Sequence, residues 1–225
     1  MDTLTLIGVI VIAVFSITSH EAAHGFAADR LGDATAREHG RLTLNPIPHI
    51  DLFFTILLPL TLLLTGAPFI FGGAKPVPID TRRLHQPRRD AALVGAAGPG
   101  ANVVIALGLM AIFAITKGTD TPATSGWLQM LAIGIFINAL LAVFNLIPIP
   151  PLDGSRVVQY FLPPGARAVY RRLEQFGLLI IVALLLFAPQ LQQPLLAAVT
   201  GLMSWMAALF GVQSQFGSVI GHALG

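Results

Sequence analysis

Long apolar runs alternate with short polar stretches along the chain, and this alternation predicts the elements. The runs 4–28, 91–115 and 127–147 can each cross a hydrocarbon core of about 30 Å, since a helix rises about 1.5 Å per residue. The runs 176–187 and 195–210 are expected to cross as well, although the first is short. The pattern therefore predicts an all-α polytopic membrane protein with about five to six transmembrane helices.

The apolar segment 52–71 differs from the other runs because Pro59, Gly66 and Pro68 interrupt it. The positions of the Lys and Arg residues indicate how this segment lies in the membrane. Of 13 Lys and Arg residues, only Lys117 lies in the 117–126 loop, and the others follow the first helix or lie in 75–89 and 156–172. The positive-inside rule places these three groups in the cytoplasm. Segment 52–71 is therefore expected to be re-entrant, with a single full crossing as the rival.

A polar stretch at 29–51 follows the first helix. Within it, 34–37 and 40–44 are short alternating segments with a glycine between them, and Asn45-Pro46 ends the pattern. This spacing predicts a small β-hairpin.

Composition supports a single integral membrane domain over 1–225, with a core at 4–175 and C-terminal helices at 176–212. The chain is 55% hydrophobic and 11% charged, and its mean hydropathy is +0.77. No polar stretch is long enough to fold with its own core. The N-terminus lacks the basic start and cleavage site of a signal peptide, so the first helix is expected to be retained. The lipid bilayer is an expected partner and nucleic acid is not.

The candidate catalytic and metal-binding residues lie near the end of the first predicted helix, at His20-Glu21-Ala-Ala-His24. Because His20 and His24 are four residues apart, a helix places both imidazoles on one face, where they can bind one metal ion. Glu21 can take a proton from a water molecule there. Ionisable groups in a membrane helix are costly, which makes an accidental match improbable.

A third ligand is needed, because catalytic zinc binds three protein ligands and a water. The chain has no cysteine, so His and carboxylate must supply it. Asp153 is the best candidate on topology: a predicted span breaks there at Pro148, Pro150 and Pro151, at the membrane depth of the histidines, and Gly154 allows a tight turn. A helix-end cap is the plainer interpretation of Asp153. The other candidates were Asp29, Asp33, Asp51 and the histidines at 39, 49, 85 and 222.

Taken together, His20-Glu21-x-x-His24 and Asn145-x-x-Pro148-x-x-x-x-Asp153-Gly154 resemble the site-2 protease family of intramembrane zinc metalloproteases. The stretches 73–78 and 97–102 resemble a compact branch of that family without a PDZ domain. The resemblance covers roughly 4–175.

The resemblance implies one Zn²⁺ per chain, bound by His20, His24 and Asp153, with Glu21 as general base and acid. It implies that Asn145 lies at the active site. It also implies regulated proteolysis of membrane-spanning substrates near the cytoplasmic side, with the substrate held as a strand against a membrane-dipping β-sheet within about 34–48. The lack of a targeting signal allows a prokaryotic cell membrane. The rival functions are a non-proteolytic scaffold and a metal or ion transporter.

Asn102 and the segment 75–78 each allow two interpretations from the sequence. Asn102 either stabilises a helix start after Gly98-Pro99 or faces the pocket. The segment 75–78 is either a binding segment or a stiff polyproline connector. The sequence leaves the oligomeric state open.

Overall fold

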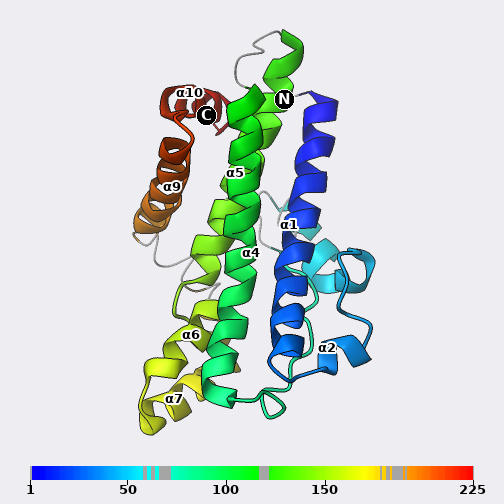
Figure 1. Ribbon diagram of the computed structural model, residues 1–225, viewed down its shortest axis with the longest axis vertical. Helices are drawn as coiled ribbons and strands as arrows, with labels where there is room; N and C mark the ends of the chain where they lie inside the picture. The colour runs from blue at the N-terminus through cyan, green and yellow to red at the C-terminus, as the bar shows by residue number, and fades with distance from the viewer. Residues whose placement is uncertain are drawn as a thin grey trace.

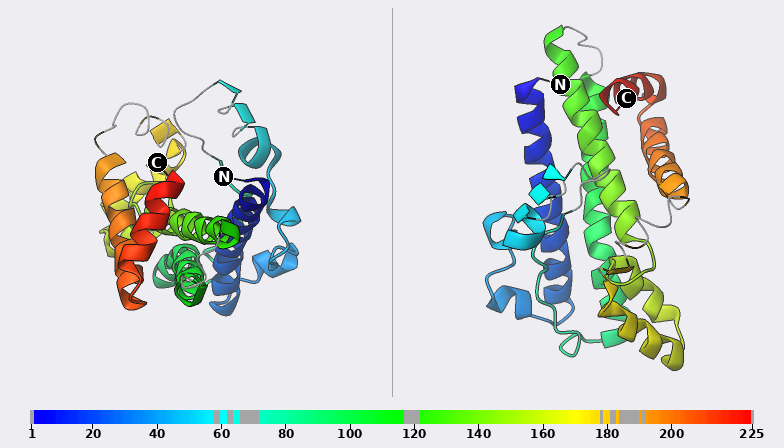
Figure 2. Two further views of the ribbon diagram at one scale, coloured as in Figure 1. Left: turned by 90° about the horizontal axis from the view of Figure 1, so that it is seen from above. Right: turned by 180° about the vertical axis from the view of Figure 1, so that it is seen from behind.

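Three long helices run side by side and form the body of the protein (Figure 1). The computed structural model describes residues 2–57, 60–61, 64–65, 72–116, 122–177, 179–180, 183, 190 and 192–224. The long helices are α1 (Thr3–Arg30), α4 (Pro87–Thr116) and α5 (Pro122–Asn145). Seen along the bundle in Figure 2, α5 lies between α1 and the C-terminal helices α9 (Gln192–Leu209) and α10 (Gln213–Leu224).

Three helices in the described part of the chain are long and apolar enough to cross a membrane: Thr3–Arg30, Pro87–Thr116 and Gly126–Asn145. They contain or overlap the predicted spans at 4–28, 91–115 and 127–147. The prediction of five to six transmembrane helices is wrong for the residues described, since neither α9 nor the described residues of 176–187 add a candidate span.

The predicted β-hairpin is also wrong, because every regular element in the described ranges is helical. Thr35–Glu38 forms the short helix α2. Gly40, expected to be the hairpin glycine, instead has a φ of 65° and ends this helix. The Arg41 N–H donates to the Ala36 carbonyl at 2.8 Å and the Gly40 N–H to that of Arg37 at 3.0 Å, which is the Schellman pattern. A left-handed glycine suits a helix end as well as a hairpin, and local hydrogen bonding selected the helix.

The segment 52–71, predicted to be re-entrant, is described only in part. Ile47–His49 forms a short 3-10 helix (η1), and Leu52–Leu57 forms one stretch of π-helix (η2). Residues 58–59, 62–63 and 66–71 lie outside the described residues, so the re-entrant path and its rival full crossing remain predictions.

The largest apolar core joins α4, α5, α9 and α10. Met110 and Phe113 of α4, Ile135 of α5 and Met206 of α9 are fully buried there. The Phe113 ring meets that of Phe216 in α10 edge to face, with centroids 5.4 Å apart. Because lipid is as apolar as these side chains, close packing stabilises this contact more than removal from water does.

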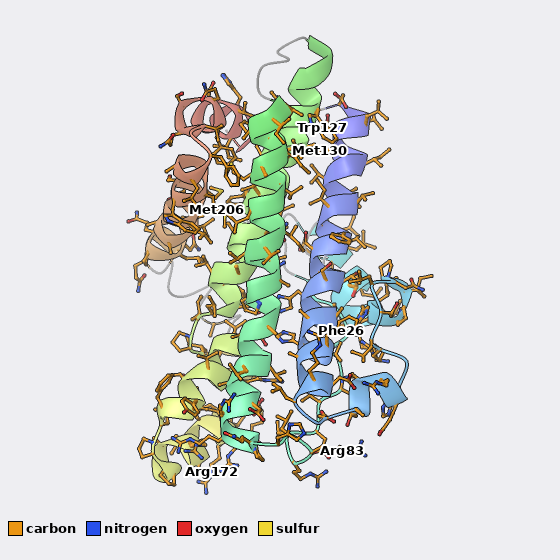
Figure 3. All side chains as sticks on the ribbon, viewed as in Figure 1. Phe26, Arg83, Trp127, Met130, Arg172 and Met206 are labelled. Atoms are coloured by element: carbon orange, nitrogen blue, oxygen red, sulfur yellow. The ribbon has the colours of Figure 1, made fainter. Side chains whose placement is uncertain are left out.

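Two short helices, α6 (Asp153–Phe161) and α7 (Pro164–Glu174), lie at the end of the bundle where α1 finishes and α4 begins (Figure 1). Arg88 ties them to α4: its guanidinium donates to the Leu162 carbonyl at 3.1 Å and lies 5.5 Å from the Tyr160 ring centroid. Basic residues gather here. Figure 3 shows Arg83 and Arg172 at this end and Trp127 and Met130 near the other.

Candidate metal centre

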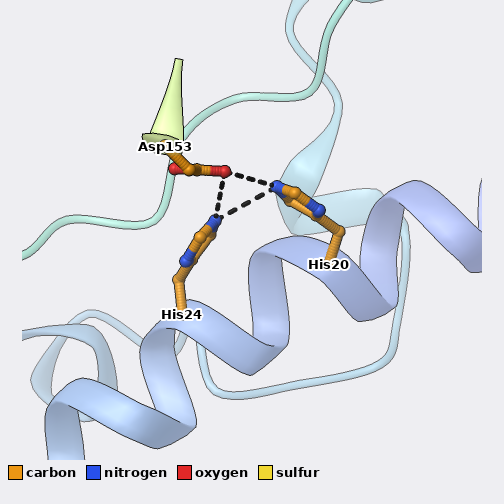
Figure 4. Close-up of side chains that lie close together, drawn as sticks. All are labelled: His20, His24 and Asp153. Atoms are coloured by element: carbon orange, nitrogen blue, oxygen red, sulfur yellow. Dashed lines mark hydrogen bonds and ion pairs between the residues drawn. The ribbon is translucent and has the colours of Figure 1, made fainter. Parts of the chain in front are cut away.

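Three potential ligand atoms from α1 and α6 converge inside the bundle (Figure 4). His20 Nε2 and His24 Nε2 lie 3.1 Å apart. Asp153 Oδ2 lies 3.1 Å from the first and 3.2 Å from the second. Both histidines are buried, and Asp153 is half-buried. The helical spacing of the histidines thus does what the sequence led us to expect, and the carboxylate comes from 133 residues away in sequence.

The hydrogen-bond partner of His24 fixes which of its ring nitrogens carries the proton. His24 Nδ1 lies 2.7 Å from the backbone carbonyl oxygen of Val94 on α4. A carbonyl only accepts hydrogen bonds, so Nδ1 carries the proton and donates it. In the neutral imidazole, Nε2 then presents a lone pair to the other two ligand atoms, as a metal ligand must.

His20 has the same arrangement with a side-chain partner. Its Nδ1 lies 2.7 Å from Oδ1 of Asn102, which is fully buried in the middle of α4. The predicted helix start after Gly98-Pro99 is wrong, since α4 runs unbroken through Pro99. Asn102 instead contacts the site.

The donor set fits zinc. Tetrahedral zinc with bonds of about 2.0–2.1 Å places its ligands roughly 3.3 Å apart, close to the three separations here. Two neutral imidazoles and a carboxylate, without thiolate, are a known catalytic ligand type. Asp153 offers a carboxylate oxygen, a ligand that binds zinc in its ionised form.

A close backbone approach positions Asp153. After α5 ends at Asn145, the chain turns and Asp153 opens α6. A Cβ on Gly154 would lie 2.1 Å from the Leu146 carbonyl oxygen. The sequence predicted that Gly154 allows a tight turn. Its φ is not positive, however, so glycine is required because a side chain would not fit there. Gly154 thus lets α6 pack against the end of α5.

A second glycine, Gly98 on α4, forms the floor of the site. A Cβ there would lie 2.4 Å from His24 Nε2 and 2.7 Å from His20 Cε1. The backbone of α4 therefore lies against both imidazole edges, and even one methyl group would occupy the space of the ligand atoms.

Glu21 lies next to the proposed ligands and contacts the segment 73–79, which has no regular secondary structure. The backbone N–H of Val77 donates to Glu21 Oε2 at 3.0 Å. The segment is held at Lys75, whose N–H donates to the His49 carbonyl at 2.8 Å and whose carbonyl accepts from Arg41 at 2.7 Å. The segment 75–78, for which the sequence predicts either a binding segment or a stiff connector, thus reaches the candidate general base through its backbone.

A cavity of about 590 Å³ opens beside these residues. Asn145 lines it, although its amide donates to the Leu141 carbonyl of its own helix at 3.0 Å. The cavity is bounded by residues of α1, α5 and α6 and by the segment 73–79: His20, Glu21, His24, Leu140, Phe144, Asn145, Asp153, Arg156, Gly73, Pro76 and Val77.

The rival third ligands are engaged elsewhere. Asp29 pairs with Arg37, and Asp33 accepts a hydrogen bond from the Thr35 backbone N–H at 3.0 Å. The Phe53 N–H donates to Asp51 at 2.9 Å. None of the three belongs to the group of ligand atoms that converge in the described residues.

Sequence reasoning missed four contributors to the site. The Val94 carbonyl and the Val77 N–H are backbone groups, which no residue type reveals. Gly98 was placed in the 97–102 stretch and in a predicted helix start, with no role at the metal site. Asn138, which hydrogen-bonds Asn102, could have been found as an amide within an apolar span.

Comparisons with known proteins identify the family. The model of peptidase family M50 matches residues 108–188. A protein named as a zinc metalloprotease, YwhC of Bacillus subtilis, is 37% identical over 187 residues, which cover 78% of each chain. Rip2 of Mycolicibacterium smegmatis, similarly named, is 32% identical over 81% of this chain and 70% of its own. Rip2 of Mycobacterium tuberculosis is 30% identical over 91% and 76%. No solved structure shows a significant match.

Proposed function

We propose, from the premise that this chain belongs to peptidase family M50, the site-2 protease family, that His20, His24 and Asp153 hold its zinc ion and Glu21 is its general base. The protein is an intramembrane zinc metalloprotease, and its substrate is a protein. The observation that supports the residue assignment is the convergence of three ligand atoms within 3.2 Å, with Nδ1 of His24 held by a carbonyl.

Zinc held by His20, His24 and Asp153 would act as a Lewis acid, which would polarise the scissile carbonyl and lower the pKa of a water molecule. Glu21 takes the proton from that water as its oxygen attacks the carbonyl carbon. When the C–N bond breaks, Glu21 delivers a proton to the departing amine nitrogen, so that a carboxylic acid and an amine result. The Val77 N–H holds Glu21 Oε2, which orients the carboxylate for both transfers.

Asn145 is proposed to bind the substrate backbone or the developing oxyanion. Its support is its place on the cavity wall that Asp153 also lines. Its amide is satisfied by Leu141 of its own helix, so substrate must compete for that hydrogen bond.

The substrate is proposed to be membrane-spanning and to be cut near the cytoplasmic side. The site lies on a candidate span, near the bundle end at which Arg83 and Arg172 lie (Figure 3). By the positive-inside rule this end faces the cytoplasm. Because the chain has no cysteine, single cysteines can test this. In intact cells, an impermeant maleimide is expected to label Thr3→Cys and to spare Arg172→Cys; the reverse pattern would place the site outside.

The catalytic assignment is tested with purified wild type and Glu21→Gln on a single-span model substrate in lipid vesicles, with zinc content measured in parallel. Glu21→Gln should keep about one zinc per chain and lose cleavage by at least about 100-fold. Glu38→Gln is the matched control, since Glu38 is exposed and pairs with Arg83 at 2.8 Å. Equal cleavage by wild type and Glu21→Gln would end the proposal.

A further inference from the structure

A buried polar network begins at His20 and runs across three helices. Asn102 of α4 and Asn138 of α5 are both fully buried, as is Ser16 of α1. Asn102 Nδ2 donates to Asn138 Oδ1 at 3.0 Å, and Asn138 Nδ2 donates to Ser16 Oγ at 2.8 Å. Two amides inside candidate spans are costly unless they are fully hydrogen-bonded, and these two are hydrogen-bonded to each other.

The direction of every hydrogen bond in this network is fixed at its far end. The Ser16 hydroxyl donates to the Ile12 carbonyl at 2.7 Å, so its oxygen is left to accept from Asn138. Asn138 Nδ2 also donates to the Gly134 carbonyl at 2.9 Å. Since backbone carbonyls can only accept, the Asn138 amide has one orientation, with Nδ2 toward these acceptors and Oδ1 toward Asn102.

The orientation of the Asn138 amide in turn fixes that of Asn102 and the position of the proton on His20. Because Asn138 Oδ1 accepts, the neighbouring atom of Asn102 must be the donor Nδ2, which also lies 3.4 Å from the Ser16 carbonyl. Asn102 Oδ1 is then the atom that faces His20 at 2.7 Å. An amide oxygen accepts, so His20 Nδ1 carries the proton and Nε2 is left with its lone pair.

We propose that Asn102 and Asn138 are positioning residues that lock His20 into the tautomer and ring orientation required for zinc binding. The inference rests on the proposed role of His20 as a zinc ligand. His24 obtains the same result from the Val94 carbonyl, so its tautomer is set by the fold, whereas that of His20 is set by two side chains. The network also ties α1, α4 and α5 together at the depth of the metal site.

Zinc affinity and histidine nitrogen spectra test the proposal on the purified full-length protein. Asn102→Leu removes the acceptor at nearly constant volume and should weaken zinc affinity, measured by chelator competition, about 10- to 100-fold. Asn102→Asp keeps an oxygen for His20 Nδ1 but loses the Nδ2 donor to Asn138, so it should bind zinc more tightly than Asn102→Leu without reaching the wild-type affinity. Asn138→Leu should weaken zinc affinity as well, because Asn102 loses the partner that orients it.

Gln129→Leu is the matched control, as it makes the same amide-to-leucine change on α5 outside the network, and it should leave zinc affinity unchanged. A zinc affinity for Asn102→Leu and Asn138→Leu within twofold of the control would overturn the proposal.

A measurement on wild type needs no variant and decides the matter even if Asn102→Leu fails to fold. In ¹⁵N-histidine-labelled, zinc-loaded protein, His20 should bind metal through Nε2 and show a slowly exchanging Nδ1 proton shifted downfield. Metal binding through Nδ1, or a rapidly exchanging Nδ1 proton, overturns the network's role. If His20 binds no zinc at all, the proposed metal site fails too, so the two failures are distinguishable.

Discussion

Glu21 accepts a hydrogen bond from the backbone N–H of Val77, 56 residues later in the chain, at 3.0 Å. The donor lies between two prolines, Pro76 and Pro78, which have no N–H of their own. Within this triplet, Val77 alone can therefore donate a backbone hydrogen bond to the carboxylate. The proline spacing thus makes one N–H specific for Glu21.

Removing the Val77 N–H should lower the rate of catalysis without changing the zinc content. Val77→Pro deletes the N–H, and we expect kcat to fall by about 10-fold or more, since a hydrogen bond to a charged group contributes about 1.5–3 kcal/mol. Val77→Ala keeps the N–H and is the control for the lost side chain. Cleavage rates and zinc content of both variants decide the matter; a Val77→Pro enzyme as fast as Val77→Ala would show that the contact does not orient Glu21.

A methyl group at position 98 should block the metal site. The Cβ of Gly98→Ala would lie 2.4 Å from His24 Nε2, so the imidazole or α4 must move, at a cost of about 1–3 kcal/mol. Zinc content and cleavage should both fall. Gly100→Ala on the same helix meets nothing within 4 Å and gains the same helix propensity, so it should retain both. Full zinc occupancy in Gly98→Ala would contradict the geometry of the site.

Asp153→Ala should lose zinc, because two histidines alone hold the ion poorly. We expect affinity to drop by more than about 100-fold, since loss of outer-shell partners already costs about 10- to 100-fold. Asp33→Asn and Asp51→Asn, which alter two rival ligands, should keep wild-type zinc content. Elemental analysis after dialysis measures all three, and a zinc-replete Asp153→Ala would remove Asp153 from the ligand set.

Gly154→Ala should displace Asp153 without altering any ligand. Its Cβ would lie 2.1 Å from the Leu146 carbonyl oxygen, and a backbone atom cannot be relieved by rotating a side chain. The start of α6 must then shift, with loss of zinc and a lower unfolding temperature. Gly165→Ala in α7, with nothing within 4 Å, should behave as wild type. Equal unfolding temperatures and zinc contents would contradict the proposed role of Gly154.

The sequence predicted those parts of the site that follow from regular helix geometry. His20 and His24 face one point because they are four residues apart, and Asp153 could be matched to them from the direction of the spans. The hairpin was predicted wrongly because a glycine such as Gly40 serves both turns and helix ends. Which hydrogen bonds form around it depends on Ala36 and Arg37, whose residue types carry no such information.

The Asn102–Asn138 network could not be predicted from the sequence, for a different reason. Each amide can be recognised as polar within an apolar run, but their contact depends on the rotation of α4 and α5 about their axes. That rotation is set by packing among fully buried side chains such as Phe113 and Ile135. Hydrophobic pattern in an apolar helix is nearly uniform, so it does not define which face turns inward.

The Gly98 floor has a thermodynamic consequence. The proposed ligands from α1 and α6 meet against the backbone of α4, so by this assignment zinc binds well only when these helices are docked. Whatever binds the docked arrangement alone also stabilises it, by about 2.7 kcal/mol at a free zinc concentration 100 times the Kd. Helix association in a bilayer lacks the driving force that water provides. Zinc depletion should therefore loosen the bundle as well as stop catalysis, and zinc supply would govern how much of the protein is folded.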